Sequence, residues 1–149
     1  MKKILFLAVC LIALSPLSLL AETMPASDSR VTYVGRTLVE GTDVSFDWTA
    51  TYFRLAFTGK SLTMRVSDTK WDDTPEMAAT RHNYFNIWID APMSAEPHRI
   101  IEVASLDTII ELIDPAYLKA SKQKVHTVIV QKRTEGPSLS RAYAPLRPH

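Results

Sequence analysis

The sequence predicts an all-β fold, a jelly-roll-like β-sandwich of about eight strands, from three observations. Apolar and polar residues alternate with a period of two from Val44 to Val66, as in strands with one buried face. Short runs of the same kind recur over roughly one hundred residues. Glycine- and proline-containing turn signals separate the runs. This combination is typical of two antiparallel sheets that share one core.

The first half of the domain contains the clearest pattern. In the stretch that begins at Val44, large apolar residues take every second position, and the same alternation resumes at Phe53 and again after Gly59. We therefore expect an antiparallel hairpin followed by a third strand. Gly35, Glu40-Gly41 and Gly59-Lys60 supply the turns. The strands expected here are Val31–Leu38, Val44–Trp48, Tyr52–Thr58 and Leu62–Ser67.

The second half continues the pattern, with turn signals at Ala91-Pro92 and Asp114-Pro115. One short helix is expected over Asp114–Lys122, because aspartate is a favourable N-cap residue and proline suits the first helical turn. The strands expected here are Tyr84–Asp90, His98–Val103, Thr108–Leu112 and Val125–Lys132.

The first 21 residues have the pattern of a secretory signal peptide. Lys2 and Lys3 precede an apolar run, Ile4–Leu14, and small residues lead to a cleavage site after Ala21. That run is too short for a helix that spans a bilayer of ~30 Å. The signal predicts a secreted or periplasmic protein with no membrane segment after cleavage. Cys10, the only cysteine of the chain, is lost with it, which excludes disulfides and a cysteine nucleophile.

The remaining chain divides into a β-sandwich domain at 30–135 and a tail at 136–149. From Gly136 onward the composition shifts to proline, serine, arginine and alanine without periodicity, so we expect disorder. The abrupt change also suggests a truncated or frameshifted gene.

The charge balance argues against a nucleic-acid partner. The chain has 17 basic and 16 acidic residues, and removal of Lys2 and Lys3 leaves 15 against 16. A near-neutral protein without a basic stripe lacks the charge that binds a phosphate backbone.

Motifs for catalysis and for cofactors are absent from the sequence. It contains no Gly-x-Ser-x-Gly elbow, no His-Glu-x-x-His and no glycine-rich dinucleotide fingerprint. The four histidines have no metal-ligand spacing, and Asp68, Asp72 and Asp73 fit a solvated acidic loop better than a calcium loop. We therefore predict no catalytic residue, no cofactor and no metal site.

Aromatic residues provide the candidate binding site. In Tyr84–Asp90 the alternation places Phe85 and two isoleucines on the core face, and Tyr84 and Trp88 on the other face. Bare aromatic rings of this size forfeit several kcal/mol of burial at about 25 cal/mol per Å². We expect a cover for them: the long segment Thr69–Asn83, which carries Trp71, a second domain, or a sugar ring. Trp88, Tyr84 and Trp71 are thus the candidate residues for a glycan or a domain interface.

The same strands carry a family resemblance. Four blocks resemble the N-terminal domain of carbohydrate esterase family 2: Arg30–Arg36 (RVTYVGR), Asp43–Gly59 (DVSFDWTATYFRLAFTG), Tyr84–Asp90 (YFNIWID) and Val125–Glu135 (VHTVIVQKRTE). The resemblance implies a jelly-roll domain that precedes a catalytic domain of the SGNH, or GDSL-like, hydrolase type. Such enzymes remove acetyl groups from plant cell-wall polysaccharides. The serine and histidine blocks of that second domain are absent, so no catalytic residue is carried over.

The sequence leaves three alternative functions open. The leading expectation is a non-catalytic accessory module of a secreted polysaccharide deacetylase, with the missing hydrolase domain as its partner and plant cell-wall polysaccharide as a further possible partner. The principal alternative is a free-standing carbohydrate-binding module that uses Trp88 and Tyr84. The third is a small esterase in its own right.

Overall fold

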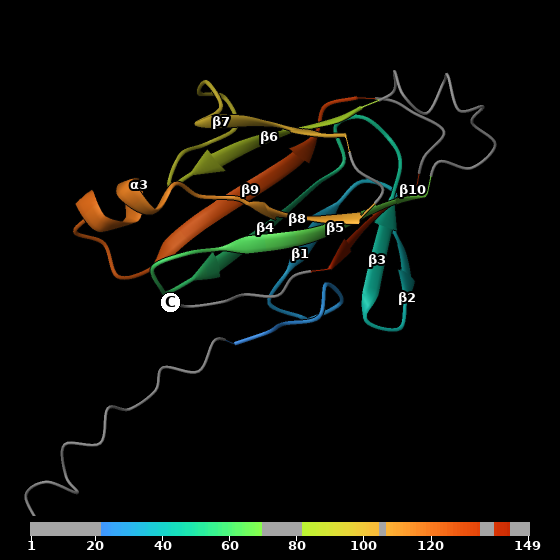
Figure 1. The fold of residues 1–149 in the computed structure, drawn as a ribbon, viewed down its shortest axis with the longest axis horizontal. Coiled ribbons are helices and arrows are strands. Elements are labelled where there is room, and N and C mark those ends of the chain that lie inside the picture. The colour runs from blue at the N-terminus through green and yellow to red at the C-terminus, as the bar shows by residue number, and fades with distance from the viewer. Residues whose placement is uncertain (1–21, 70–81, 105–106, 135–138, 144–149) are drawn as a thin grey trace, which may run out of the picture.

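The computed structural model describes residues 22–69, 82–104, 107–134 and 139–143, and these form a sandwich of two antiparallel sheets (Figure 1). The first sheet has the spatial order β1 (Thr32–Val34), β4 (Tyr52–Phe57), β9 (His126–Lys132), β6 (Asn83–Ile89) and β7 (Arg99–Val103). The second has the order β2 (Leu38–Glu40), β3 (Asp43–Phe46), β10 (Leu139–Tyr143), β5 (Thr63–Thr69) and β8 (Asp107–Glu111). The predicted all-β sandwich is confirmed.

One helix, α3 (Pro115–Ala120), lies at an end of the sandwich between β8 and β9 (Figure 1). Its N-cap is Asp114, whose side chain accepts a hydrogen bond from the backbone N–H of Ala116, and Leu118 anchors it in the core. The expected capping pattern therefore starts the helix where the sequence predicted it. No helix of the described residues is long and apolar enough to cross a membrane.

The core fills the space between the sheets with the residues that alternate along each strand. Phe85 is fully buried and packs edge-on against Phe46, with 6.3 Å between ring centroids. Val128 and Val130 on β9 are equally buried. Each such side chain stabilises the fold by ~1.5–3 kcal/mol relative to an exposed one.

The predicted hairpin between Val44 and Val66 is wrong in its pairing. β3 lies in the second sheet and pairs with β2 and β10, whereas β4 lies in the first sheet and pairs with β1 and β9. Their apolar faces meet across the core, where the rings of Phe46 and Phe53 lie 6.5 Å apart. Alternation specifies which face of a strand is buried. The same alternation occurs in two strands that pair within one sheet and in two strands that face each other across the core, so it does not distinguish them.

Gly35 divides the first expected strand, Val31–Leu38, into β1 and β2. Its φ of +116° favours glycine, and a Cβ there would lie 2.6 Å from the Thr51 hydroxyl. The chain therefore turns at this point and passes from the first sheet to the second.

Strand β10 corrects the expectation of a tail without structure. Residues 139–143 pair with β3 on one side and with β5 on the other, in the centre of the second sheet. Backbone pairing of this kind needs no alternation of side chains, which is why the sequence pattern did not reveal it. The expected signal peptide at 1–21 lies outside the described residues, as do 135–138 and 144–149 of the expected tail.

Candidate functional site

Trp88 is buried, contrary to the exposure that the alternation predicted. Its side chain is 4% exposed, and its indole N–H donates a hydrogen bond to the carbonyl of Ala95 at 2.9 Å. Ala95 belongs to the connection between β6 and β7, which folds back over the outer face of the sheet. Because the strand pattern contains no information on which connection covers an outer face, this cover was missed.

Tyr84 lies on the same outer face but remains partly exposed. Its hydroxyl donates to a carboxylate oxygen of Glu102 on the neighbouring strand β7, at 3.0 Å, and His82 contacts the same carboxylate. The bond to Glu102 raises the pKa of Tyr84, and the contacts with His82 and then Tyr84 lower the pKa of Glu102. Trp71 lies outside the described residues. Of the three predicted aromatic residues, the structure therefore describes only Tyr84 and Trp88, which lie on one face of β6.

A polar cluster around Asp90 is the best-built constellation in the described part of the chain. Asp90 Oδ2 lies 2.7 Å from His126 Nδ1 and accepts a hydrogen bond from the Tyr117 hydroxyl at 3.1 Å. Its Oδ1 accepts from the backbone N–H of Thr127 at 2.8 Å. An ionised carboxylate only accepts, so Nδ1 of His126 carries the proton that points to it. The cluster joins the end of β6, the start of β9 and helix α3.

The electrostatics of the cluster favour the ionised carboxylate. Desolvation opposes ionisation, yet the hydrogen bonds from His126, Thr127 and Tyr117 together lower the pKa of Asp90. Desolvation and the hydrogen bond to Asp90 raise the pKa of Tyr117. Asp90 also has a positive φ of 52°, a backbone conformation that aspartate tolerates better than most residues.

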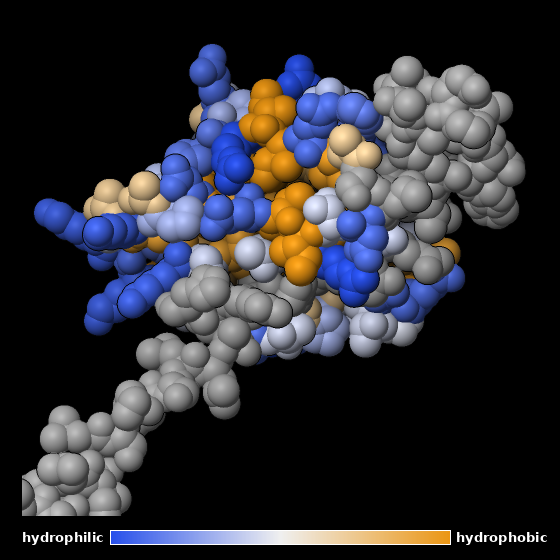
Figure 2. Space-filling view, viewed as in Figure 1, coloured by the Kyte–Doolittle hydropathy of each residue, from blue (hydrophilic) through white to orange (hydrophobic). Residues whose placement is uncertain are grey.

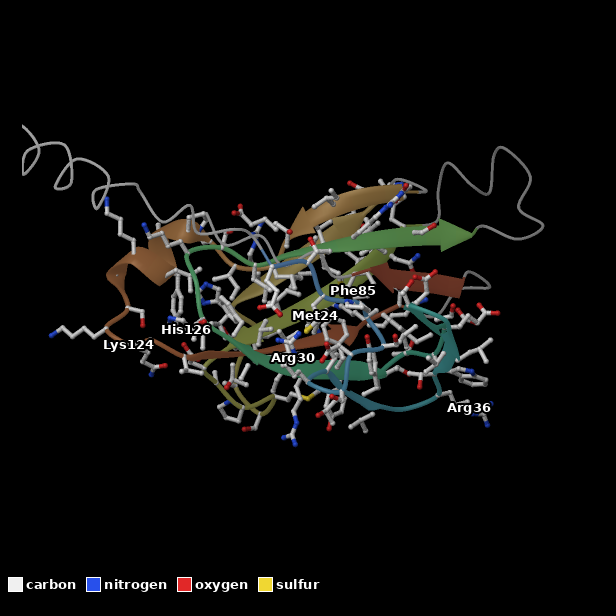
Figure 3. The ribbon with its side chains drawn as sticks, turned by 90° about the horizontal axis from the view of Figure 1, so that it is seen from below. Met24, Arg30, Arg36, Phe85, Lys124 and His126 are labelled. Atoms are coloured by element: carbon white, nitrogen blue, oxygen red, sulfur yellow. The ribbon has the colours of Figure 1, made fainter. Side chains whose placement is uncertain are left out.

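Burial limits what this cluster can do chemically. His126 is 2% exposed and packs against the ring of Phe57, with 5.7 Å between centroids. A general base must reach the proton that it abstracts, and this imidazole does not reach the surface. Figure 3 shows His126 at one end of the sandwich, near α3, and Phe85 further along its core. We therefore interpret the Asp90–His126 pair as a support for the surface above it.

A pocket of about 470 Å³ opens at that surface, between the starts of β7 and α3 and the end of β8. His98, Arg99, Glu111 and Asp114 line it. The edge of the Tyr117 ring packs on the imidazole of His98, with 4.9 Å between centroids. This pocket could not be predicted from the sequence, because its residues come from three separate elements and have no motif spacing.

Neither the pocket nor the cluster is built as a metal centre. Within the residues that the structure describes, no group of three or more histidine, aspartate, glutamate or cysteine side chains is arranged to hold an ion.

Large apolar side chains are also exposed away from the pocket. Leu38 and Val39 on β2 are 54% and 59% exposed, and Trp48 is 53% exposed with the Arg36 guanidinium 4.6 Å from its ring centroid. Arg36 and His126 lie at opposite ends of the sandwich (Figure 3). Figure 2 shows further apolar atoms in the middle of the face formed by β5 and β8, where Ile109 is exposed.

Comparison with known proteins gives one family match. The family model described as carbohydrate esterase 2 N-terminal matches residues 33–142. A search of curated protein sequences finds no match.

Solved structures share the fold at low identity. A family two carbohydrate esterase from Cellvibrio japonicus has a TM-score of 0.56 and 16% identity, with 85% of this chain and 34% of that chain covered. One from Clostridium thermocellum, in complex with cellohexaose, has a TM-score of 0.55 and 16% identity, with 77% and 29% covered. An acetyl xylan esterase from Butyrivibrio proteoclasticus has a TM-score of 0.63 and 11% identity, with 87% and 32% covered. The chain thus spans about one third of the length of each.

Proposed function

Because the chain belongs to the carbohydrate esterase 2 N-terminal family, we propose that it is the non-catalytic accessory domain of a secreted polysaccharide deacetylase. The observation that carries the proposal is the extent of the match: residues 33–142 include nearly the whole sandwich, from β1 to β10. The match continues past Gly136, so the family pattern does not stop at the change in composition. His126 of the Asp90 cluster is buried, so this imidazole does not reach a substrate as a general base.

The proposed partner is a hydrolase domain of the SGNH type. The chain spans 34% and 32% of two esterases with the same fold, which leaves two thirds of those chains for other parts. Exposed Leu38, Val39 and Trp48, with Arg36 on the indole, are suited to a domain contact, because tryptophan and arginine are enriched in such interfaces. In this proposal the accessory domain supports the enzyme structurally, and the hydrolase domain removes acetyl groups from plant cell-wall polysaccharide.

The alternative of a free-standing carbohydrate-binding module on Trp88 and Tyr84 has less support. A stacking platform needs an accessible ring, and Trp88 is 4% exposed beneath the β6–β7 connection. Tyr84 remains partly exposed but is held by Glu102.

Hydrolysis of an aryl acetate by the purified chain tests the non-catalytic role. We expect no turnover above the rate of a heat-denatured sample. Turnover that disappears on substitution of a single serine would show a small esterase and overturn the proposal.

Sequencing of the neighbouring DNA tests the proposed partner domain. We expect the DNA that follows the coding sequence to encode an SGNH-type hydrolase domain, in this frame or another, which would also decide whether the gene is truncated. An unrelated neighbour would count against the proposed partner.

Export is part of the same proposal and is tested separately. Expression of the full chain in a bacterial host should yield a periplasmic or secreted product whose mature sequence begins at Glu22. Retention of Met1 in an intracellular product would exclude a cleaved signal peptide.

A further inference from the structure

We propose that the pocket of His98, Arg99, Glu111 and Asp114 binds a neutral saccharide through its hydroxyl groups. Its lining includes neither Tyr84 nor Trp88, and it lies beside α3, at the end of the sandwich opposite Arg36 (Figure 3). The choice of polysaccharide fragments as ligands rests on the proposed function, whereas the chemical class follows from the pocket.

The size and the charges of the pocket indicate the class. Its volume of about 470 Å³ lies within the range of roughly 300–1,000 Å³ that is usual for small-ligand sites. The lining contains one guanidinium and two carboxylates, so with a neutral His98 imidazole it has one negative charge in excess, which disfavours phosphates and carboxylates. A sugar hydroxyl both donates and accepts, and it can therefore donate to Glu111 or Asp114 while it accepts from Arg99.

Two of the lining side chains, those of Arg99 and Asp114, are held in place before a ligand arrives. Arg99 Nη1 donates to the backbone carbonyl of Glu111 at 3.1 Å, which fixes the guanidinium across the gap between β7 and β8. Asp114 Oδ1 accepts from the backbone N–H of Ala116 at 2.7 Å, and this leaves Oδ2 as the oxygen available to a ligand. Side chains that are already ordered lose little conformational entropy on binding.

The Asp90 cluster extends this order to the His98 side of the pocket. Tyr117 packs against His98, and its hydroxyl is bonded to Asp90, which is itself held by His126 and Thr127. The Asp90–His126 pair is thus a positioning pair: it orients Tyr117, and Tyr117 in turn orients His98 at the pocket.

A titration of the ¹⁵N-labelled full chain, followed by ¹H–¹⁵N NMR, tests the site. Cellohexaose, mannopentaose and xylohexaose are added separately, with and without EDTA. We expect saturable shifts of the His98, Arg99 and Glu111 amides with at least one of them. Arg99→Ala and Glu111→Gln should each weaken binding at least about tenfold, the loss typical of a hydrogen bond to a charged group.

Glu102→Gln on β7 is the matched control, because it makes the same change on the same edge of the sandwich at a carboxylate that does not line the pocket. It should leave the affinity unchanged, and the NMR spectra verify that all three variants are folded. Absence of shifts with every saccharide at millimolar concentration would overturn the inference, as would binding that Glu111→Gln does not weaken. Loss of binding in EDTA would instead indicate a cation site. Aryl-acetate turnover and the neighbouring gene decide the proposed function independently of these outcomes.

Discussion

Substitution of Asp90 tests whether this carboxylate joins β6, β9 and α3. Asp90→Ala removes the acceptor for three donors, the N–H groups of His126 and Thr127 and the hydroxyl of Tyr117. The imidazole is buried, so its unpaired N–H costs about 1–3 kcal/mol. Water can replace Asp90 at the exposed Thr127, which adds little.

The backbone conformation at position 90 adds a second loss of stability for the alanine variant. Its φ is +52°, where alanine is disfavoured relative to glycine by about 1 kcal/mol. We therefore expect a loss of about 2–4 kcal/mol in the free energy of unfolding for Asp90→Ala and about 1–3 kcal/mol for Asp90→Gly. The glycine variant separates the lost hydrogen bonds from the conformational cost.

Urea unfolding followed by far-UV circular dichroism measures both variants. The reasoning would be refuted if Asp90→Gly were less stable than Asp90→Ala, or if both variants lay within 0.5 kcal/mol (about the scatter of neutral surface substitutions) of the original chain. The pH dependence of stability is measured by comparing Asp90→Asn with the original chain. Since the pKa of Asp90 is lowered in the folded state, its contribution is present above the unfolded value near 3.8 and is lost as the pH falls through the folded value. The stability difference between the original chain and Asp90→Asn should therefore shrink below about pH 4.

Three further predictions follow from burial and backbone geometry. Phe85→Ala should lower the free energy of unfolding by about 3–5 kcal/mol, measured by urea unfolding, because the ring is fully buried at the centre of the core. Gly35→Ala should destabilise more than Gly41→Ala in the same assay, since a Cβ at Gly35 would lie 2.6 Å from the Thr51 hydroxyl and one at Gly41 would meet nothing within 4 Å; equal losses would contradict this. Trp88→Phe should cost about 1 kcal/mol through its bond to the Ala95 carbonyl. It should leave saccharide binding unchanged, and a loss of binding in the NMR titration would restore Trp88 as a binding residue.

The sequence predicted the features that depend on local structure. The alternating faces, the helix start at Asp114 and the all-β class were all visible, because local geometry alone determines them. Lys132, a charged residue in phase with Val128 and Val130, shows how strictly the pattern holds, since its side chain is fully buried near Asp47.

Contacts between segments that are far apart in the chain could not be predicted from the sequence. The partner of β3 depends on which sheet each strand joins, and the cover of Trp88 depends on the path of the β6–β7 connection. His126 follows Asp90 by 36 residues, and no local spacing indicates that they meet. The pocket combines a strand start, a strand end and a helix start, so its residues become a site only through the tertiary fold.

The place of β10 has a consequence for biosynthesis. The last strand of the sandwich in sequence lies between β3 and β5, which precede it by more than half the length of the domain. While the chain emerges from the ribosome, the edges of β3 and β5 therefore stay open until residues 139–143 have been made. Contacts of such long range form slowly, and open strand edges promote aggregation. Nascent chains that stop short of Leu139 should consequently depend on chaperones until synthesis closes the sheet.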